Sequence, residues 1–101
     1  MRAVFISPYE IPVHTRLAGL YARLGETRKA VRERRAVVEL DPVDLAEALY
    51  QLALAQYEAG DLQSARRSVL RALEEAPSFE KAQELLLTLR RKANQPGAGE
   101  R

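Results

Sequence analysis

The sequence predicts an all-α fold of antiparallel helix-turn-helix repeats, with about five helices. Small residues, glycines and prolines recur after 35 residues: Leu17, Ala18, Gly25, Ala30 and Pro42 match Leu52, Ala53, Gly60, Ala65 and Pro77. Between these glycines and prolines, apolar residues recur three and four positions apart, which is the spacing of an amphipathic helix. With four Tyr, two Phe and no Trp, Leu, Ala and Val must fill the interior, which suits closely packed helices.

The first repeat is predicted to contain two helices. The first covers about Val13–Leu24 and ends at Gly25, since glycine readily adopts the left-handed conformation that terminates helices. The second covers Thr27–Leu40 and ends at Asp41-Pro42, because proline disfavours helical geometry in the residue before it.

The second repeat carries clearer start signals. Asp44 stands three residues before Glu47, a variant of the capping box in which each side chain can satisfy a free backbone N–H. A third helix is therefore expected over Leu45–Ala59. Asp61 is placed to cap a fourth helix that ends at Ala76-Pro77, the position that matches the end of the first repeat.

A fifth helix is expected to close the array. Ser78 is placed to cap it, and the helix runs from Phe79 to about Ala93. Its inward stripe consists of Phe79, Ala82, Leu86 and Leu89. The run LLLTL over residues 85–89 holds more apolar surface than one helix face buries against one neighbour, so another surface is expected to cover part of it.

Both ends of the chain are predicted to differ from the helical domain, which covers residues 11–93. Residues 1–10 are expected to form an extended N-terminal segment, extended from Val4 to Ile6 and followed by turns at Pro8 and Pro12. This segment either frays or packs along the groove of the array or against a second copy. Residues 94–101, NQPGAGER, are expected to form a disordered tail.

The charge balance does not by itself indicate a strongly charged partner. Sixteen basic and 14 acidic residues leave a net charge of +2, which does not indicate nucleic acid binding. Arg28, Arg32, Arg35 and their acidic neighbours predict a solvated surface rich in salt bridges. The basic run Arg90–Lys92 suits the negative end of a helix dipole better than phosphate or anionic lipid. We therefore expect no nucleic acid and no membrane as partner.

The compartment is weakly indicated. The chain has no cysteine, which excludes disulfides and thiolate metal sites and is compatible with either redox environment. The first residues contain an apolar run only from Ala3 to Ile6, which is shorter than a signal-peptide core and far shorter than a membrane span. A cytoplasmic location is the expectation.

Catalytic patterns are absent from the sequence. The single histidine, His14, falls on a helix packing position, and no serine has a paired base in its sequence context. The five glycines form no phosphate-binding loop. The sequence predicts no enzymatic activity, no metal and no cofactor.

The two units resemble the tetratricopeptide repeat (TPR). The family places an aromatic, a Leu, a small residue and a Tyr along the first helix of each unit. Here these places hold His14, Leu17, Ala18 and Tyr21, then Leu49, Leu52, Ala53 and Gln56. The resemblance implies a short right-handed superhelical array with repeats at 11–44 and 45–77 and a capping helix at 78–93. The chain also resembles the C-terminal TPR tails of larger bacterial proteins.

Arg34 departs from the family pattern, which prefers an aromatic at this place, and the second unit has Val69 there. One interpretation is that the aliphatic stem of Arg34 packs while its guanidinium reaches water or a Glu. The other is that Arg34 belongs to an interface. Gly19, inside the first helix, indicates either a close approach to the backbone or a tolerated cost.

The resemblance implies that the first helix of each unit and the capping helix line a concave binding face. Helical spacing nominates Thr15, Gly19, Arg23, Glu47, Tyr50, Leu54, Tyr57, Glu58, Lys81, Glu84, Leu85 and Thr88 as partner-binding residues. The stripe of Tyr50, Leu54 and Tyr57 suits recognition of a peptide or helix, or else packs within the domain. A chaperone-tail clamp is not expected, because Thr15, Gly19 and Leu85 replace its polar residues.

The function expected from these observations is a non-enzymatic protein-interaction or assembly module. The alternative is an accessory TPR domain or fragment of a larger bacterial enzyme, such as a peptidase. Two repeats and a cap make a marginal core, so a homodimer through the closing helix or the N-terminal segment is a further expectation.

Overall fold

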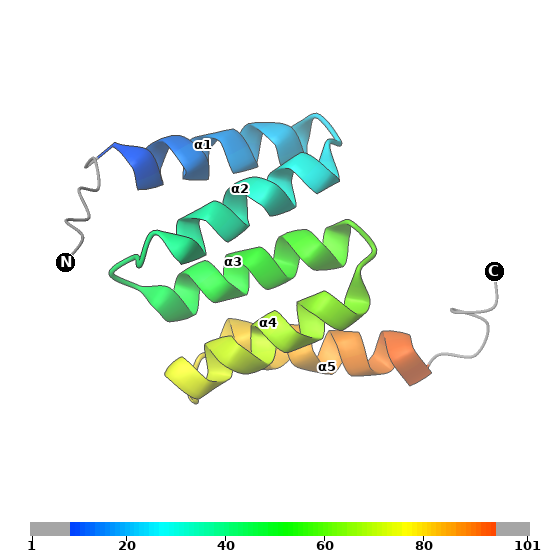
Figure 1. Ribbon diagram of the computed structural model, residues 1–101. Helices are drawn as coiled ribbons and strands as arrows, with labels where there is room; N and C mark the ends of the chain where they lie inside the picture. The colour runs from blue at the N-terminus through cyan, green and yellow to red at the C-terminus, as the bar shows by residue number, and fades with distance from the viewer. Residues whose placement is uncertain (1–8, 95–101) are drawn as a thin grey trace.

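A computed structural model describes residues 9–94 of the chain. In this range the secondary structure is five helices and no strand, as Figure 1 shows. Their bounds are α1 Glu10–Arg23, α2 Thr27–Glu39, α3 Leu45–Glu58, α4 Leu62–Glu75 and α5 Glu80–Asn94. The predicted all-α class is confirmed. The predicted extended residues Val4–Ile6 and tail residues 95–101 lie outside the described range.

Each helix packs against the next one along the chain, and α3 also contacts α5. The helices α1 to α4 run back and forth side by side, and α5 lies along α4 at the end of the stack (Figure 1). The fold is therefore two antiparallel hairpins, α1–α2 and α3–α4, followed by a closing helix. This is the TPR-like architecture predicted from the repeat.

The two hairpin turns are built alike. Gly25 and Gly60 have φ of +79° and +86°, a region that side-chain-bearing residues enter at a cost. The residue after each glycine donates its amide to the helix carbonyl five positions back: Glu26 to Tyr21 at 2.8 Å and Asp61 to Gln56 at 2.9 Å. The predicted helix ends at these glycines are confirmed to within two residues.

The start of α1 corrects the prediction. The helix begins at Glu10, three residues before the expected Val13, so Pro12 lies in its first turn and does not form a separate turn. The physical reason is that the first turn of a helix leaves its N–H groups without intrahelical partners, so proline loses no hydrogen bond there. Glu10, which was predicted to belong to the extended segment, is therefore helical.

The predicted aspartate caps are present in the second hairpin. Asp44 Oδ1 accepts from the Glu47 amide at 3.0 Å, and Asp61 Oδ1 accepts from the Ser64 amide at 3.2 Å. The Glu47 carboxylate, expected to reach back to Asp44, instead accepts from Gln51 Nε2 at 2.8 Å.

Helix α5 starts differently from the prediction. It begins at Glu80, after a turn, so Ser78 lies too early in the chain to cap it. The Gln83 side chain donates to the Pro77 carbonyl at 2.8 Å and ties this turn to the helix. At the other end α5 includes Asn94, which was expected to belong to the tail.

Replacing Asp61 with alanine is expected to lower the free energy of unfolding by about 1 kcal/mol at neutral pH, the usual contribution of an N-cap. Hydrogen bonds from Ser64 hold the pKa of Asp61 below its usual value. A depressed folded pKa stabilises the protein above the unfolded pKa, and that stabilisation is lost as pH falls through the folded pKa. Urea unfolding of both proteins at neutral and acidic pH measures this. If the difference in unfolding free energy between the wild type and Asp61→Ala stays constant down to about pH 2, this prediction is contradicted.

The core lies between α3, α4 and α5. Its buried residues are Leu49, Ala53, Ala65, Val69, Ala72, Ala82, Leu85 and Leu89. Ala53 and Ala65 are 0% exposed, and their small side chains allow α3 and α4 to approach closely. Both belong to the small residues that recur after 35 positions in the sequence.

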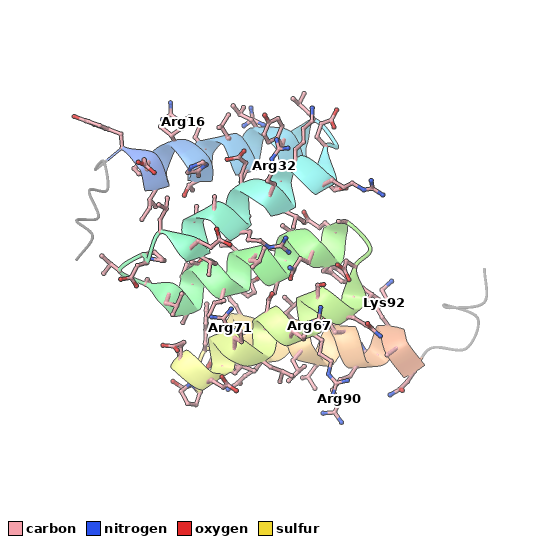
Figure 2. All side chains as sticks on the ribbon, viewed as in Figure 1. Arg16, Arg32, Arg67, Arg71, Arg90 and Lys92 are labelled. Atoms are coloured by element: carbon pink, nitrogen blue, oxygen red, sulfur yellow. The ribbon has the colours of Figure 1, made fainter. Side chains whose placement is uncertain are left out.

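The basic surface is less paired than the sequence predicted. Within residues 9–94 the ion pairs are His14–Glu33 and Arg32–Glu33, the latter at 3.9 Å. Figure 2 shows basic side chains on both hairpins and on α5. The prediction of a surface rich in salt bridges was wrong, because long exposed side chains gain little from pairing in water.

Candidate functional site

A pocket of about 510 Å³ lies at the N-terminal ends of α1 and α3 and the C-terminal end of α2. We call it the groove pocket. Its walls include Ile11 and Thr15 from α1, Arg34 and Val37 from α2, and Glu47 and Gln51 from α3. The connection from Pro42 to Asp44 closes one side. Two predicted partner-binding residues, Thr15 and Glu47, are in it.

Comparison of the two units explains why this space is open. Thr15 corresponds to Tyr50 and Asp44 to Phe79 at the 35-residue offset. In the second unit the rings of Tyr50 and Phe79 pack at 5.3 Å between centroids with a 54° tilt, and both residues pack on the core. In the first unit the same two places hold a threonine and a helix-capping aspartate, which fill much less space.

Three other walls of the groove pocket differ from their counterparts in polarity and not by being smaller. Glu47 and Gln51 correspond to Ala82 and Leu86, and Ala82 is 0% exposed while Leu86 packs against the core. Arg34 corresponds to Val69, which is also 0% exposed. Places that apolar side chains fill in the second unit therefore hold polar or charged side chains beside the pocket in the first.

Arg34 is the cation of the groove pocket. Its side chain is half-buried, and burial lowers the pKa of the guanidinium, while the carboxylates of Glu47 and Glu58 oppose that shift. Within residues 9–94 Arg34 makes no hydrogen bond to another side chain and no ion pair within 4.0 Å. Its donors are thus not used to hold the described fold together.

The stripe of Tyr50, Leu54 and Tyr57 packs against the core. All three are half-buried. Part of each side chain therefore packs within the domain, as one of the two interpretations expected, and part stays accessible. Burial raises the pKa of Tyr50, and the carboxylates of Glu47 and Glu84 add to this.

Leu85 corrects the predicted site. It was nominated as a partner-binding residue, but it is only 7% exposed and belongs to the core. The leucine of the LLLTL run that faces solvent is Leu87, at 52% exposed. The predicted inward residues Phe79, Ala82, Leu86 and Leu89 all belong to the core or pack against it. The inward face is wider than predicted, because α5 contacts both α3 and α4 and buries a wider stripe than one neighbour would.

The remaining nominated residues are accessible to different degrees. Arg23, Glu58, Lys81 and Glu84 are exposed, and Gly19 and Thr88 are half-buried. A Cβ built on Gly19 meets nothing within 4 Å, so no described group approaches that backbone closely. Sequence reasoning missed Ile11, Val37 and Gln51 as pocket walls. A position-by-position comparison of the two units would have found them, since each differs in size or polarity from its counterpart.

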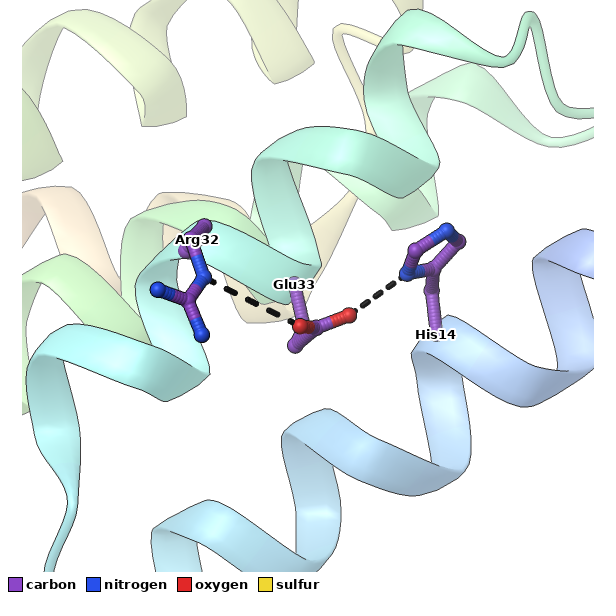
Figure 3. Close-up of polar contacts among 3 residues, drawn as sticks. All are labelled: His14, Arg32 and Glu33. Atoms are coloured by element: carbon purple, nitrogen blue, oxygen red, sulfur yellow. Dashed lines mark hydrogen bonds and ion pairs between the residues drawn. The ribbon is translucent and has the colours of Figure 1, made fainter.

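His14 has a packing role inside the first hairpin. Its Nδ1 lies 2.5 Å from Glu33 Oε1, and Figure 3 shows Glu33 between His14 and Arg32. The second hairpin has a different polar pair, in which the Ser68 hydroxyl donates to Gln56 at 2.7 Å. A polar contact thus joins the two helices of each hairpin, partly buried in the first and buried in the second. Within residues 9–94, no group of three or more His, Asp or Glu side chains is arranged to hold a metal ion.

The comparisons with known proteins point to the same fold. Residues 46–97, just over half of the chain, match the family model described as the Fis1 C-terminal tetratricopeptide repeat. The matched range contains almost all of α3, all of α4 and all of α5. No curated protein matches the chain. Among residues 9–94, none of the helices has the length and apolar character that crossing a membrane requires.

Proposed function

Because the chain belongs to the Fis1 C-terminal tetratricopeptide repeat family, we propose that it is a non-enzymatic protein-interaction module that binds a peptide or helix of another protein in its groove pocket. Repeats of this type generally bind other proteins. The observation that carries the proposal is the contrast between the two units: one interface is filled by Tyr50 and Phe79, and the equivalent one is open.

The groove pocket has the composition of a recognition surface. Ile11 and Pro42 offer apolar contacts, and Arg34, Glu47 and Gln51 offer groups that can orient a polar segment. Its volume of about 510 Å³ is enough for a few side chains of a partner, not for a folded domain. A short segment is therefore the form of partner that fits.

Filling the groove pocket tests this proposal. Thr15→Trp places a large ring where the second unit has Tyr50. It is expected to weaken at least tenfold the binding of a peptide from a partner protein obtained by affinity capture on the wild-type chain, since the ring would occupy the space that the peptide needs. The matched control is Gln63→Trp, an exposed position on α4 outside the pocket. Isothermal titration of both variants with the same peptide measures the difference.

If Thr15→Trp, Gln63→Trp and the wild type bind the peptide with equal affinity, the proposal that the peptide binds in the groove pocket is wrong. Sedimentation of the chain alone accompanies the titrations, because a second copy is the other partner predicted from the sequence. Self-association that Thr15→Trp abolishes would make that second copy the occupant of the groove pocket.

A further inference from the structure

The groove pocket contains one charged group whose hydrogen-bonding capacity is not used by its neighbours. The Glu47 carboxylate accepts from Gln51, and the Asp44 carboxylate caps α3. The Arg34 guanidinium, with five N–H donors, makes no hydrogen bond to another side chain within residues 9–94. Of the three charged side chains that line the pocket, Arg34 is the one that makes no hydrogen bond within residues 9–94, and it is the only one that can donate to a ligand.

The repeat shows that the fold does not need an arginine here. Val69 occupies the equivalent place in the second unit, is fully buried and belongs to the core. Arg34 is half-buried, so its side chain loses part of its hydration without gaining a hydrogen bond, which costs free energy. A carboxylate of a ligand would offset this cost, because the planar guanidinium can donate two parallel hydrogen bonds to its two oxygens.

We infer that the groove pocket recognises a segment that carries one carboxylate beside apolar side chains, with Arg34 binding the carboxylate and Ile11 and Pro42 contacting the apolar neighbours. This inference rests on the proposed function and names the chemistry of its partner. The carboxylate comes either from an Asp or Glu side chain or from the end of a chain, and both present the same two oxygens.

The surrounding charges restrict the ligand to few negative charges. Asp44 and Glu47 line the pocket with Arg34, and the Glu58 carboxylate is near enough to influence the guanidinium. These acids repel a polyanion, so a long acidic tract or a nucleic acid is disfavoured. A single carboxylate placed against Arg34 gains the ion pair while its flanking residues remain neutral or basic.

Arg34→Val is the decisive variant, because it installs the residue that the second unit already uses. A pool of synthetic 12-residue peptides with an apolar pair around a central Glu is compared with the same pool containing Gln. The wild type is expected to prefer the Glu pool, and the best Glu peptide is expected to lose at least about tenfold in affinity on Arg34→Val. The melting temperature is expected to stay equal or to rise. Arg35→Val, an exposed neighbour outside the pocket, is the charge-matched control.

Three outcomes separate the claims. If the Glu-to-Gln change in the peptide costs affinity in the wild type but not in Arg34→Val, the pairing of Arg34 with the ligand carboxylate is established. Peptides with free and amidated C-termini then distinguish a side-chain carboxylate from the carboxylate at a chain end. If Arg34→Val binds as tightly as the wild type while Thr15→Trp does not bind, the inference fails and the proposed function stands. If no peptide from either pool binds in a manner that Thr15→Trp blocks, both fail.

Discussion

Replacing Leu49 with alanine is expected to lower the free energy of unfolding by about 2–5 kcal/mol, the range for removing a buried leucine side chain. Leu49 is 0% exposed on α3 and packs in the core between α3, α4 and α5. The shortened side chain loses its transfer free energy and leaves a cavity, because helices held at alanine crossings cannot collapse freely.

The expected readout is a fall in melting temperature of roughly 10 °C or more, since each kcal/mol shifts a domain of this size by about 4–8 °C. A chain with two repeats and a cap has little stability to lose, and a fraction of Leu49→Ala molecules should be unfolded at 37 °C. Leu87→Ala, at a position 52% exposed on α5, is the control and is expected to change stability little. Similar melting temperatures for the two variants would refute the position of the core.

Replacing His14 with leucine is expected to have the second large effect on the free energy of unfolding. The change removes the hydrogen-bond donor of Glu33, whose side chain is 11% exposed, and leaves a nearly buried carboxylate with Arg32 only at 3.9 Å. We expect a loss of about 1–3 kcal/mol, the cost of a buried group left without its partner. Leucine is the residue that the second unit has at this place, so packing alone predicts no loss.

The double variant His14→Leu with Glu33→Ser distinguishes these two explanations. It reproduces the Leu49 and Ser68 of the second unit and removes the unpaired carboxylate, so part of the stability is expected to return. Urea unfolding of the four proteins in the cycle gives the coupling free energy between His14 and Glu33. A coupling near zero would mean that the contact does not stabilise the first hairpin.

Much of the fold was accessible from local signals. Gly25 and Gly60 end their helices, and Asp44 and Asp61 cap theirs, because the backbone conformation or hydrogen bond involved spans only a few residues. Pro12 and Ser78 were assigned wrongly because their local signals are ambiguous. Pro12 suits a turn as well as the first turn of a helix, and Ser78 suits a helix cap as well as the turn before α5. Only the packing of α1 and α5 selects between these places.

The binding surface was less predictable. Helical spacing nominated Leu85 as a contact residue and left the alternatives for Arg34 and for the tyrosine stripe open. Whether a side chain on α5 faces solvent depends on both α3 and α4, and the space beside Arg34 depends on three helices at once. No single helix contains that information.

The sequence by itself determined the class of the protein: five helices in two hairpins and a cap, with a glycine turn inside each hairpin and alanines where helices pack closely. These features follow from spacing and from backbone preferences that act over one or two helical turns. Only the tertiary structure decided that the first unit is hollow where the second is filled, and that Arg34 lies in that hollow. Packing brings residues from distant helices together, and the difference between Thr15 and Tyr50 acquires meaning only when the neighbouring helix is in place.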